Sequence, residues 1–193
     1  MKLILASRSP RRAELMTMLG IPFEVICSNV SEDPAEISDP SLLVEQLAKG
    51  KADAVFKSHP NDCVIGCDTI VFLDGEILGK PLTPEMAAGF LKKLRGRTHQ
   101  VFTGICIRLG KRTLVRNECT YVTFGHMSDA EIRKYVSSGE PFDKAGGYGI
   151  QGHAGVFIDS IHGNYFNVVG LPVSLLYRML KDIGYLVPVS ADE

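Results

Sequence analysis

An acidic residue interrupts one of the most apolar stretches of this chain. Residues 64–72 read VIGCDTIVF, which is typical of a buried β-strand, and Asp68 lies at the centre of the run. Burial of an unpaired carboxylate is costly, so such a residue needs a cation, a metal ion or a chemical role. The alternative is that Asp68 caps a turn where the strand breaks. We favour a catalytic carboxylate, because the chain supplies several basic residues that could face it.

The segments around this strand predict a mixed α/β fold. Strands are expected where apolar and β-branched residues run together, at residues 3–6, 23–27, 63–73, 76–78, 100–109, 113–124, 156–161 and 165–169, the last two as a hairpin. Helices are expected where a capping residue or proline precedes apolar residues at helical spacing, at residues 11–19, 40–56, 85–94, 129–138 and 173–183. This order predicts a mixed central sheet flanked by helices. The length fits one domain over residues 1–193, with room for two lobes.

Charge and cysteine content narrow the class of protein. The net charge is −1, from 21 basic and 22 acidic side chains, which argues against a protein that coats nucleic acid. No apolar run approaches the length of a membrane span, and the first residues do not resemble a signal peptide. We therefore expect a cytoplasmic protein without a membrane partner. Cys27, Cys63, Cys67 and Cys106 are expected to be small buried residues rather than zinc ligands.

The first loop predicts an anion site. Ser7 and Arg8 follow the first strand, and Ser9 with Pro10 begins a helix whose first turn contains Arg11 and Arg12. Free backbone N–H groups at a helix start favour an anion, and arginine suits phosphate oxygens. A solvated basic turn is the alternative. The segment is not a P-loop, because the required glycine spacing is missing.

Four further residues are ordinary when each is taken alone. Glu32 lies in an acidic loop and Lys51 on a helix, and both read first as solvated charges. Lys80 lies between Gly79 and Pro81, after the hairpin that begins with the Asp68 strand, so the hairpin could bring it back toward that acid. Gln151 closes a glycine-rich stretch that is otherwise a plain turn, but its amide can read the edge of a base.

Five motifs together resemble the Maf family of nucleoside triphosphate pyrophosphatases. In chain order they are LILASxSPRR at residues 3–12, GxDT at 66–69, GKP at 79–81, DKAGxYGIQG at 143–152 and VGLP at 169–172. The resemblance covers residues 1 to about 184. It implies an elongated fold like that of the inosine-triphosphate pyrophosphatases, with two lobes around a cleft. The segment 148–152 is similar to the dTTP/UTP subgroup.

The resemblance also implies an activity, a cofactor and roles for individual residues. A nucleoside triphosphate, dTTP or UTP, is hydrolysed between its α and β phosphates with a divalent cation, Mg²⁺ or Mn²⁺. Asp68 is the base that activates water and contacts the metal, with Glu32 as a second carboxylate. The remaining roles are phosphate binding for Ser7, Arg11, Lys51 and Lys80, and base selection for Arg12, Thr69 and Gln151.

Two other functions remain open from the sequence. One is a nucleotide-binding regulator of septum formation that needs no turnover, and the other is a purine-triphosphate pyrophosphatase of the same fold. The presence of Asp68 favours an enzyme over the regulator. Modified pyrimidine nucleotides remain open as substrates, and the resemblance is also compatible with a homodimer.

Overall fold

The computed structural model describes residues 1–28 and 37–186. Its strands are β1 (Leu3–Ala6), β2 (Phe23–Val25), β3 (Cys63–Leu73), β4 (Glu76–Leu78), β5 (Thr98–Leu109), β6 (Arg112–Phe124) and β7 (Ile158–His162). Its α-helices are α1 (Pro10–Thr17), α2 (Pro40–Phe56), α3 (Pro84–Leu94), α4 (Asp129–Ser137), α5 (Tyr165–Val169) and α6 (Val173–Asp182). Short 3₁₀ turns occupy Glu140–Asp143, Ala145–Gly147 and His153–Phe157. Within the described residues, no helix is long and apolar enough to cross a membrane.

The seven strands described form one mixed sheet in the order β2-β1-β3-β5-β6-β7, with β4 beside β3. β1 runs parallel to β3 and pairs with it as far as Gly66. β4 returns antiparallel and pairs with β3 from Val71 onward. Over residues 67–70, therefore, no strand of the described chain pairs with β3 on this side, while β5 pairs along its other side. The sheet has a gap here, and Asp68 lies in it.

α2 lies unusually close to the sheet because two glycines permit it. A methyl group added to Gly66 would lie 2.6 Å from the backbone nitrogen of Ala52, and one added to Gly104 would lie 2.5 Å from the carbonyl carbon of Val44. Both partners belong to the backbone of α2, so a side chain at either glycine would push the helix away. This close approach brings Lys51 of α2 over β3.

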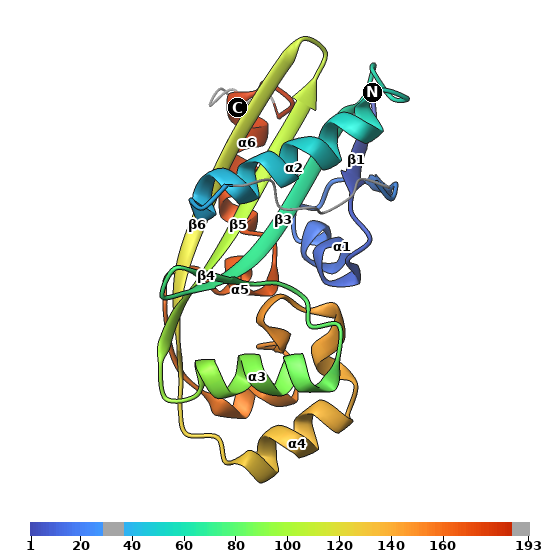
Figure 1. Cartoon of the computed structure of the whole chain (residues 1–193). Coiled ribbons are helices and arrows are strands. Elements are labelled where there is room, and N and C mark those ends of the chain that lie inside the picture. The colour runs from blue at the N-terminus through green and yellow to red at the C-terminus, as the bar shows by residue number, and fades with distance from the viewer. Residues whose placement is uncertain (29–36, 187–193) are drawn as a thin grey trace.

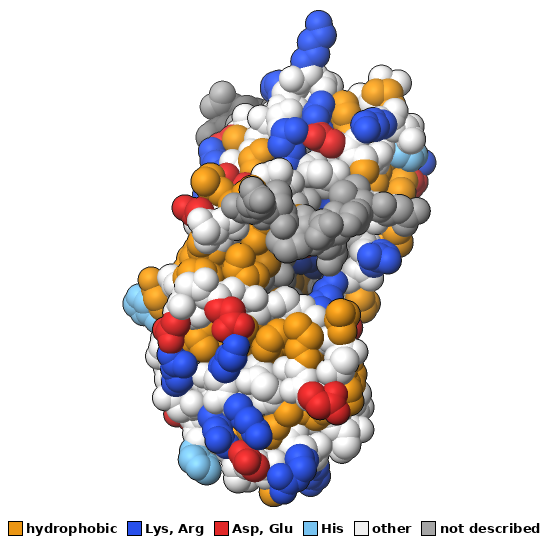
Figure 2. Space-filling model, in the orientation of Figure 1, with side chains coloured by type: hydrophobic (Ala, Val, Ile, Leu, Met, Phe, Trp, Pro, Cys, Tyr) orange, Lys and Arg blue, Asp and Glu red, His pale blue; other side chains and the backbone are white. Residues whose placement is uncertain are grey.

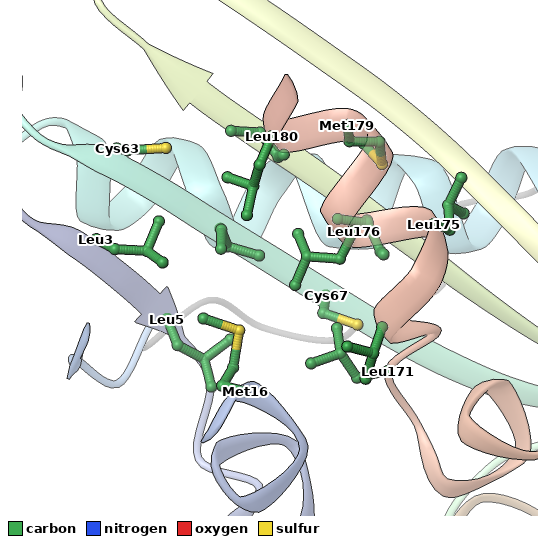
Figure 3. Close-up of a cluster of buried hydrophobic side chains, with 14 of the residues drawn as sticks. Leu3, Leu5, Met16, Cys63, Cys67, Leu171, Leu175, Leu176, Met179 and Leu180 are labelled. Carbon is green, nitrogen blue, oxygen red and sulfur yellow. The ribbon is translucent and has the colours of Figure 1, made fainter. Parts of the chain in front are cut away.

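Of four clusters of buried hydrophobic residues among the described residues, the two largest lie in separate lobes along the long strands (Figure 1), and the two smaller ones lie where α2 packs on the sheet. In the first lobe, α1 and α6 pack on one face of β1, β3 and β5 around residues such as Met16, Cys67 and Leu176 (Figure 3). In the second lobe, α3 and α4 pack on β3, β5 and β6 around Leu91 and Phe124. β3 passes from one core to the other, and residues 68–70 span the junction. These findings confirm the predicted mixed sheet with two lobes.

Local capping signals explain why the helices begin where they do. Ser9, Thr83 and Ser128 each accept a hydrogen bond from a backbone N–H of the first helical turn, and Ser128 forms a full capping box with Glu131. Asp39 caps α2 in the same way. Each of these starts was predicted from sequence.

Two sequence-based expectations are wrong. Residues 165–169 form helix α5 rather than the second strand of a hairpin, because the side chain of Asn164 accepts from the backbone N–H of Phe166 and caps a helical turn. Cys27 is exposed, since it follows β2 at the edge of the sheet, whereas Cys63, Cys67 and Cys106 are buried as expected.

Candidate active site

A cleft of about 610 Å³ lies at the gap in the sheet, between the two lobes. Some Lys and Arg side chains lie at this waist of the molecule, and others are spread over both lobes (Figure 2). The cleft is lined by every predicted site residue that the structure describes: Ser7, Arg11, Arg12, Lys51, Asp68, Thr69, Lys80 and Gln151. Glu32 lies outside the described residues. Five segments that are far apart in sequence thus supply one site.

Asp68 and Lys51 form a buried ion pair at the floor of this cleft. The Lys51 ammonium donates to Oδ1 of Asp68, and the two residues are only 7% and 8% exposed respectively. Lys51 of α2 therefore supplies the cation that a carboxylate within an apolar strand needs. A buried pair of this kind is weak evidence for stability, because desolvation offsets most of the attraction. Its position in a cleft between two lobes favours a functional role.

Arg12 is held by three contacts that aim its guanidinium at the cleft. Its Nε donates to the carbonyl of Gly170 at 2.8 Å, and its Nη2 donates to the hydroxyl of Thr69 at 2.9 Å. Its Nη1 is 3.4 Å from Oγ of Ser7. Because a guanidinium has five N–H donors, these contacts leave donors for a ligand. Arg12 and Thr69 therefore act as one polar unit on the face of β3 opposite Asp68.

Arg11 bridges the two lobes across the cleft. Its Nη1 donates to Oδ2 of Asp143 at 2.8 Å, and Asp143 also accepts from Lys144 at 2.6 Å. Partial burial works against ionisation of Asp143, but the hydrogen bonds from Lys144 and Arg11 outweigh it and hold the pKa of this carboxyl below its usual value. The sequence did not predict this pairing. An incoming polyanion would compete with Asp143 for Arg11.

A carboxylate beneath the glycine-rich stretch fixes the turn that presents Gln151. Glu140 accepts from the hydroxyl of Tyr135 at 3.0 Å, from the backbone N–H of His153 at 3.1 Å, and lies 2.8 Å from Nδ1 of His153. Partial burial alone would raise the pKa of Glu140. The hydrogen bonds from His153 and Tyr135 outweigh this effect, so the pKa lies below its usual value. A methyl group at Gly152 would lie 2.5 Å from Cδ of Glu140, so a side chain there would displace this carboxylate from its hydrogen bonds.

The wall of the cleft that contains Tyr148 is anchored in the hydrophobic core of the second lobe. The Tyr148 hydroxyl lies 2.6 Å from Nε2 of His99, and the two rings meet edge to face. Burial raises the pKa of the tyrosine and lowers the pKa of His99 to about 4. Both groups are therefore neutral near pH 7. Nearby, the backbone N–H of Gly146 donates to the carbonyl of Gly79, which ties the loop of Lys80 to the same wall.

Two contributors to the site have no role that the sequence indicates. Glu140 reads as a surface acid, and Asp143 appears only as the first residue of the motif at 143–152. The contacts that tie them to the site, from Arg11 to Asp143 and from the His153 backbone to Glu140, join residues more than 10 positions apart.

The donor set of the described cleft suits a cation that is shared with a substrate. Within residues 1–28 and 37–186, no cluster of three or more acidic, histidine or cysteine side chains could enclose a metal ion by itself. Asp68 offers a carboxylate in a cleft lined by cations. Mg²⁺ is commonly bound by one or two carboxylates together with substrate phosphates and water, so the residues present fit that mode of binding.

The comparisons with known proteins agree with this architecture. The model of the family described as Maf-like protein matches residues 2–183, so this chain belongs to the Maf family. A dTTP/UTP pyrophosphatase of Symbiobacterium thermophilum is 50% identical over 184 residues, with 95% of each chain covered. A dTTP/UTP pyrophosphatase of Bacillus mycoides is 48% identical over 180 residues, covering 93% of this chain and 94% of that protein.

Among solved structures, this chain is similar to a nucleoside-triphosphatase, a dITP/XTP pyrophosphatase, of Mycobacterium abscessus. It is 15% identical, with a TM-score of 0.48, and the match covers 97% of this chain and 100% of that one.

Proposed function

We propose that this protein hydrolyses dTTP and UTP between the α and β phosphates, giving the nucleoside monophosphate and pyrophosphate. The observation that carries the proposal is the buried Asp68–Lys51 pair at the floor of a cleft rimmed by Ser7, Arg11 and Lys80. Relatives 48–50% identical over nearly the whole chain bear the name dTTP/UTP pyrophosphatase. The net charge of −1 supports a free nucleotide, rather than a nucleic-acid polymer, as the substrate.

In this proposal, Asp68 is the general base. It accepts a proton from the water that attacks the α phosphorus, the bond from that phosphorus to the bridging oxygen breaks, and pyrophosphate leaves. A triphosphate carries a charge near −4 and repels a nucleophile. Cations fixed around it before the reaction are often the largest contribution to catalysis of such a step. Lys51, Lys80 and Arg11 supply them.

We assign the divalent cation, Mg²⁺ or Mn²⁺, to Asp68, with Glu32 as a second carboxylate. The metal would neutralise phosphate charge and make the phosphorus a better electrophile. Oxygen donors favour these hard cations over softer metals. Arg12, Thr69 and Gln151 select the base, which accords with their placement on two walls of the same cleft. We place the activity in the cytoplasm, where the five free cysteines stay reduced.

The test is pyrophosphate release from a panel of nucleoside triphosphates, each with Mg²⁺, with Mn²⁺ and with chelator. We expect metal-dependent release from dTTP and UTP and little release from CTP, ATP or GTP. Preference for a purine would keep the chemistry and overturn the base selection. Binding of nucleotide without any release would overturn the proposed enzyme and favour a nucleotide-binding regulator.

A further inference from the structure

The ion pair between Arg11 and Asp143 joins the two lobes across the cleft. Arg11 lies on α1, which packs in the first lobe, and Asp143 ends the turn Glu140–Asp143, which packs in the second (Figure 1). Nη1 of Arg11 donates to Oδ2 of Asp143 at 2.8 Å, whereas Nη2 reaches only the backbone carbonyl of that residue at 3.4 Å. The guanidinium therefore does not bind the carboxylate through both of its terminal nitrogens, and N–H donors remain for a ligand.

The neighbouring Arg12 is held in a different way. Its contacts are with neutral oxygens, namely the carbonyl of Gly170 and the hydroxyls of Thr69 and Ser7. The partner of Arg11 is instead a carboxylate, an anion whose oxygens accept from a guanidinium as phosphate oxygens do. Arg11 therefore has an anionic partner within the protein, and a phosphate can take the place of that partner.

Exchange of this partner costs little. The side chains of Arg11 and Asp143 are 26% and 60% exposed, and an ion pair with such exposure is weak because water and salt screen it. Asp143 also has a second cation, since Nζ of Lys144 donates to its Oδ1 at 2.6 Å. The two cations bind different oxygens, so the carboxylate stays hydrogen-bonded and neutralised when Arg11 leaves. Arg11, Asp143 and Lys144 all line the cleft, where a phosphate can reach them.

We propose that Asp143 is an internal competitor of phosphate for Arg11, and that it promotes release of the pyrophosphate product. A triphosphate takes Arg11 from Asp143 as it binds, and Asp143 takes Arg11 back as pyrophosphate leaves. When only a fraction of the protein is competent to bind, the apparent Kd rises by the reciprocal of that fraction. An exposed ion pair that is formed in about 80% of molecules weakens binding about fivefold. The inference rests on the proposed function and extends it to the release of product.

The experiment measures Kd for inorganic pyrophosphate by calorimetric titration of the whole chain in the presence of chelator. Asp143→Asn keeps the shape of the side chain and removes its charge, so Kd should fall about fivefold. Asp129→Asn is the matched control, because Asp129 is also exposed and paired with two cations, Arg95 and Lys92, but does not line the cleft. It makes the same change in net charge and should leave Kd unchanged. At about 0.5 M salt the difference between wild type and Asp143→Asn should shrink below about twofold, because salt weakens the exposed pair.

A second variant tests whether the effect passes through Arg11. In an Arg11→Gln background, Asp143→Asn should change Kd by less than about twofold, because the competition no longer exists. The inference is overturned if the full effect persists in that background, if Asp143→Asn leaves Kd unchanged, or if it raises Kd, as expected for a carboxylate that only positions Arg11. It is also overturned if neither wild type nor Asp143→Asn binds pyrophosphate. Failure of the proposed function has a different signature, which is no pyrophosphate release from UTP or dTTP by the wild-type enzyme.

Discussion

Replacement of Asp68 by asparagine should abolish most of the turnover without weakening nucleotide binding. Asparagine keeps the shape of the side chain and removes its charge and basicity. The other acid that the structure places in the described cleft, Asp143, is already bound to Arg11 and Lys144 and lies on the opposite wall. It cannot replace Asp68 as a base. A positioned general base contributes about 10²- to 10⁴-fold, so kcat should fall by that factor.

Binding should respond in the opposite direction. In the wild-type cleft the carboxylate of Asp68 pairs with Lys51 and repels the phosphates. One phosphate charge at a separation of about 6 Å, with an effective dielectric constant of about 20, is repelled by about 3 kcal/mol. With chelator present, Kd should therefore stay the same or fall, by up to roughly 100-fold.

Two measurements separate these effects. Pyrophosphate release gives kcat, and calorimetric titration with a non-hydrolysable α,β-methylene analogue of UTP gives Kd, with chelator and with Mg²⁺. Asp53→Asn is the matched control. Like Asp68, Asp53 is an aspartate paired with basic side chains, here Lys49 and Arg108, but it lies on α2 and does not line the cleft. It should leave kcat nearly unchanged. A kcat for Asp68→Asn within about tenfold of wild type would refute the assignment of a general base.

Three further predictions concern the scaffold of the site. Gly104→Ala should destabilise the protein by about 1–3 kcal/mol, because the added methyl group meets the backbone of α2. Gly89→Ala is the control: nothing lies near this position of α3, so the change should be neutral or stabilising. Thermal unfolding of the two variants measures the difference. Burial lowers the pKa of His99 to about 4 from 6.5, so the unfolded chain takes up its proton first as pH falls. The free energy of unfolding should therefore drop by up to about 3 kcal/mol from pH 6.5 to 4, and His99→Asn should remove this dependence in urea titrations. Glu140→Ala should free the turn of Gln151 and raise KM for UTP about tenfold with little change in kcat, measured by steady-state kinetics.

Element boundaries were predictable wherever a short-range signal decides them. Ser9, Thr83 and Ser128 begin helices by bonding to backbone groups three residues away, so the information lies within one turn. The same kind of signal was missed at Asn164. There the aromatic and β-branched residues that follow favour a strand, and the cap of a five-residue helix outweighed that preference.

The sequence predicted residues that line one cleft, but it did not predict the contacts between them. Motifs that resemble a known family marked Asp68, Arg12 and Gln151, and the structure places all three in one cleft. The pairing of Arg11 with Asp143 spans 132 positions and depends on how the two lobes meet. No local pattern specifies such a contact, because it follows from the packing of both cores.

The gap in the sheet connects these observations. Successive residues of a strand point to opposite faces, so Asp68 turns toward α2 and Lys51, while Thr69 turns toward α1 and Arg12. In a fully paired strand these faces would belong to separate sites. Here β1 has ended and β4 has not begun, so both side chains open into a single cleft. The group proposed for chemistry and the group proposed for base selection are thus joined by one peptide unit. A displacement of α2 or of β3, such as the one expected for Gly104→Ala, should therefore reduce turnover and base discrimination together.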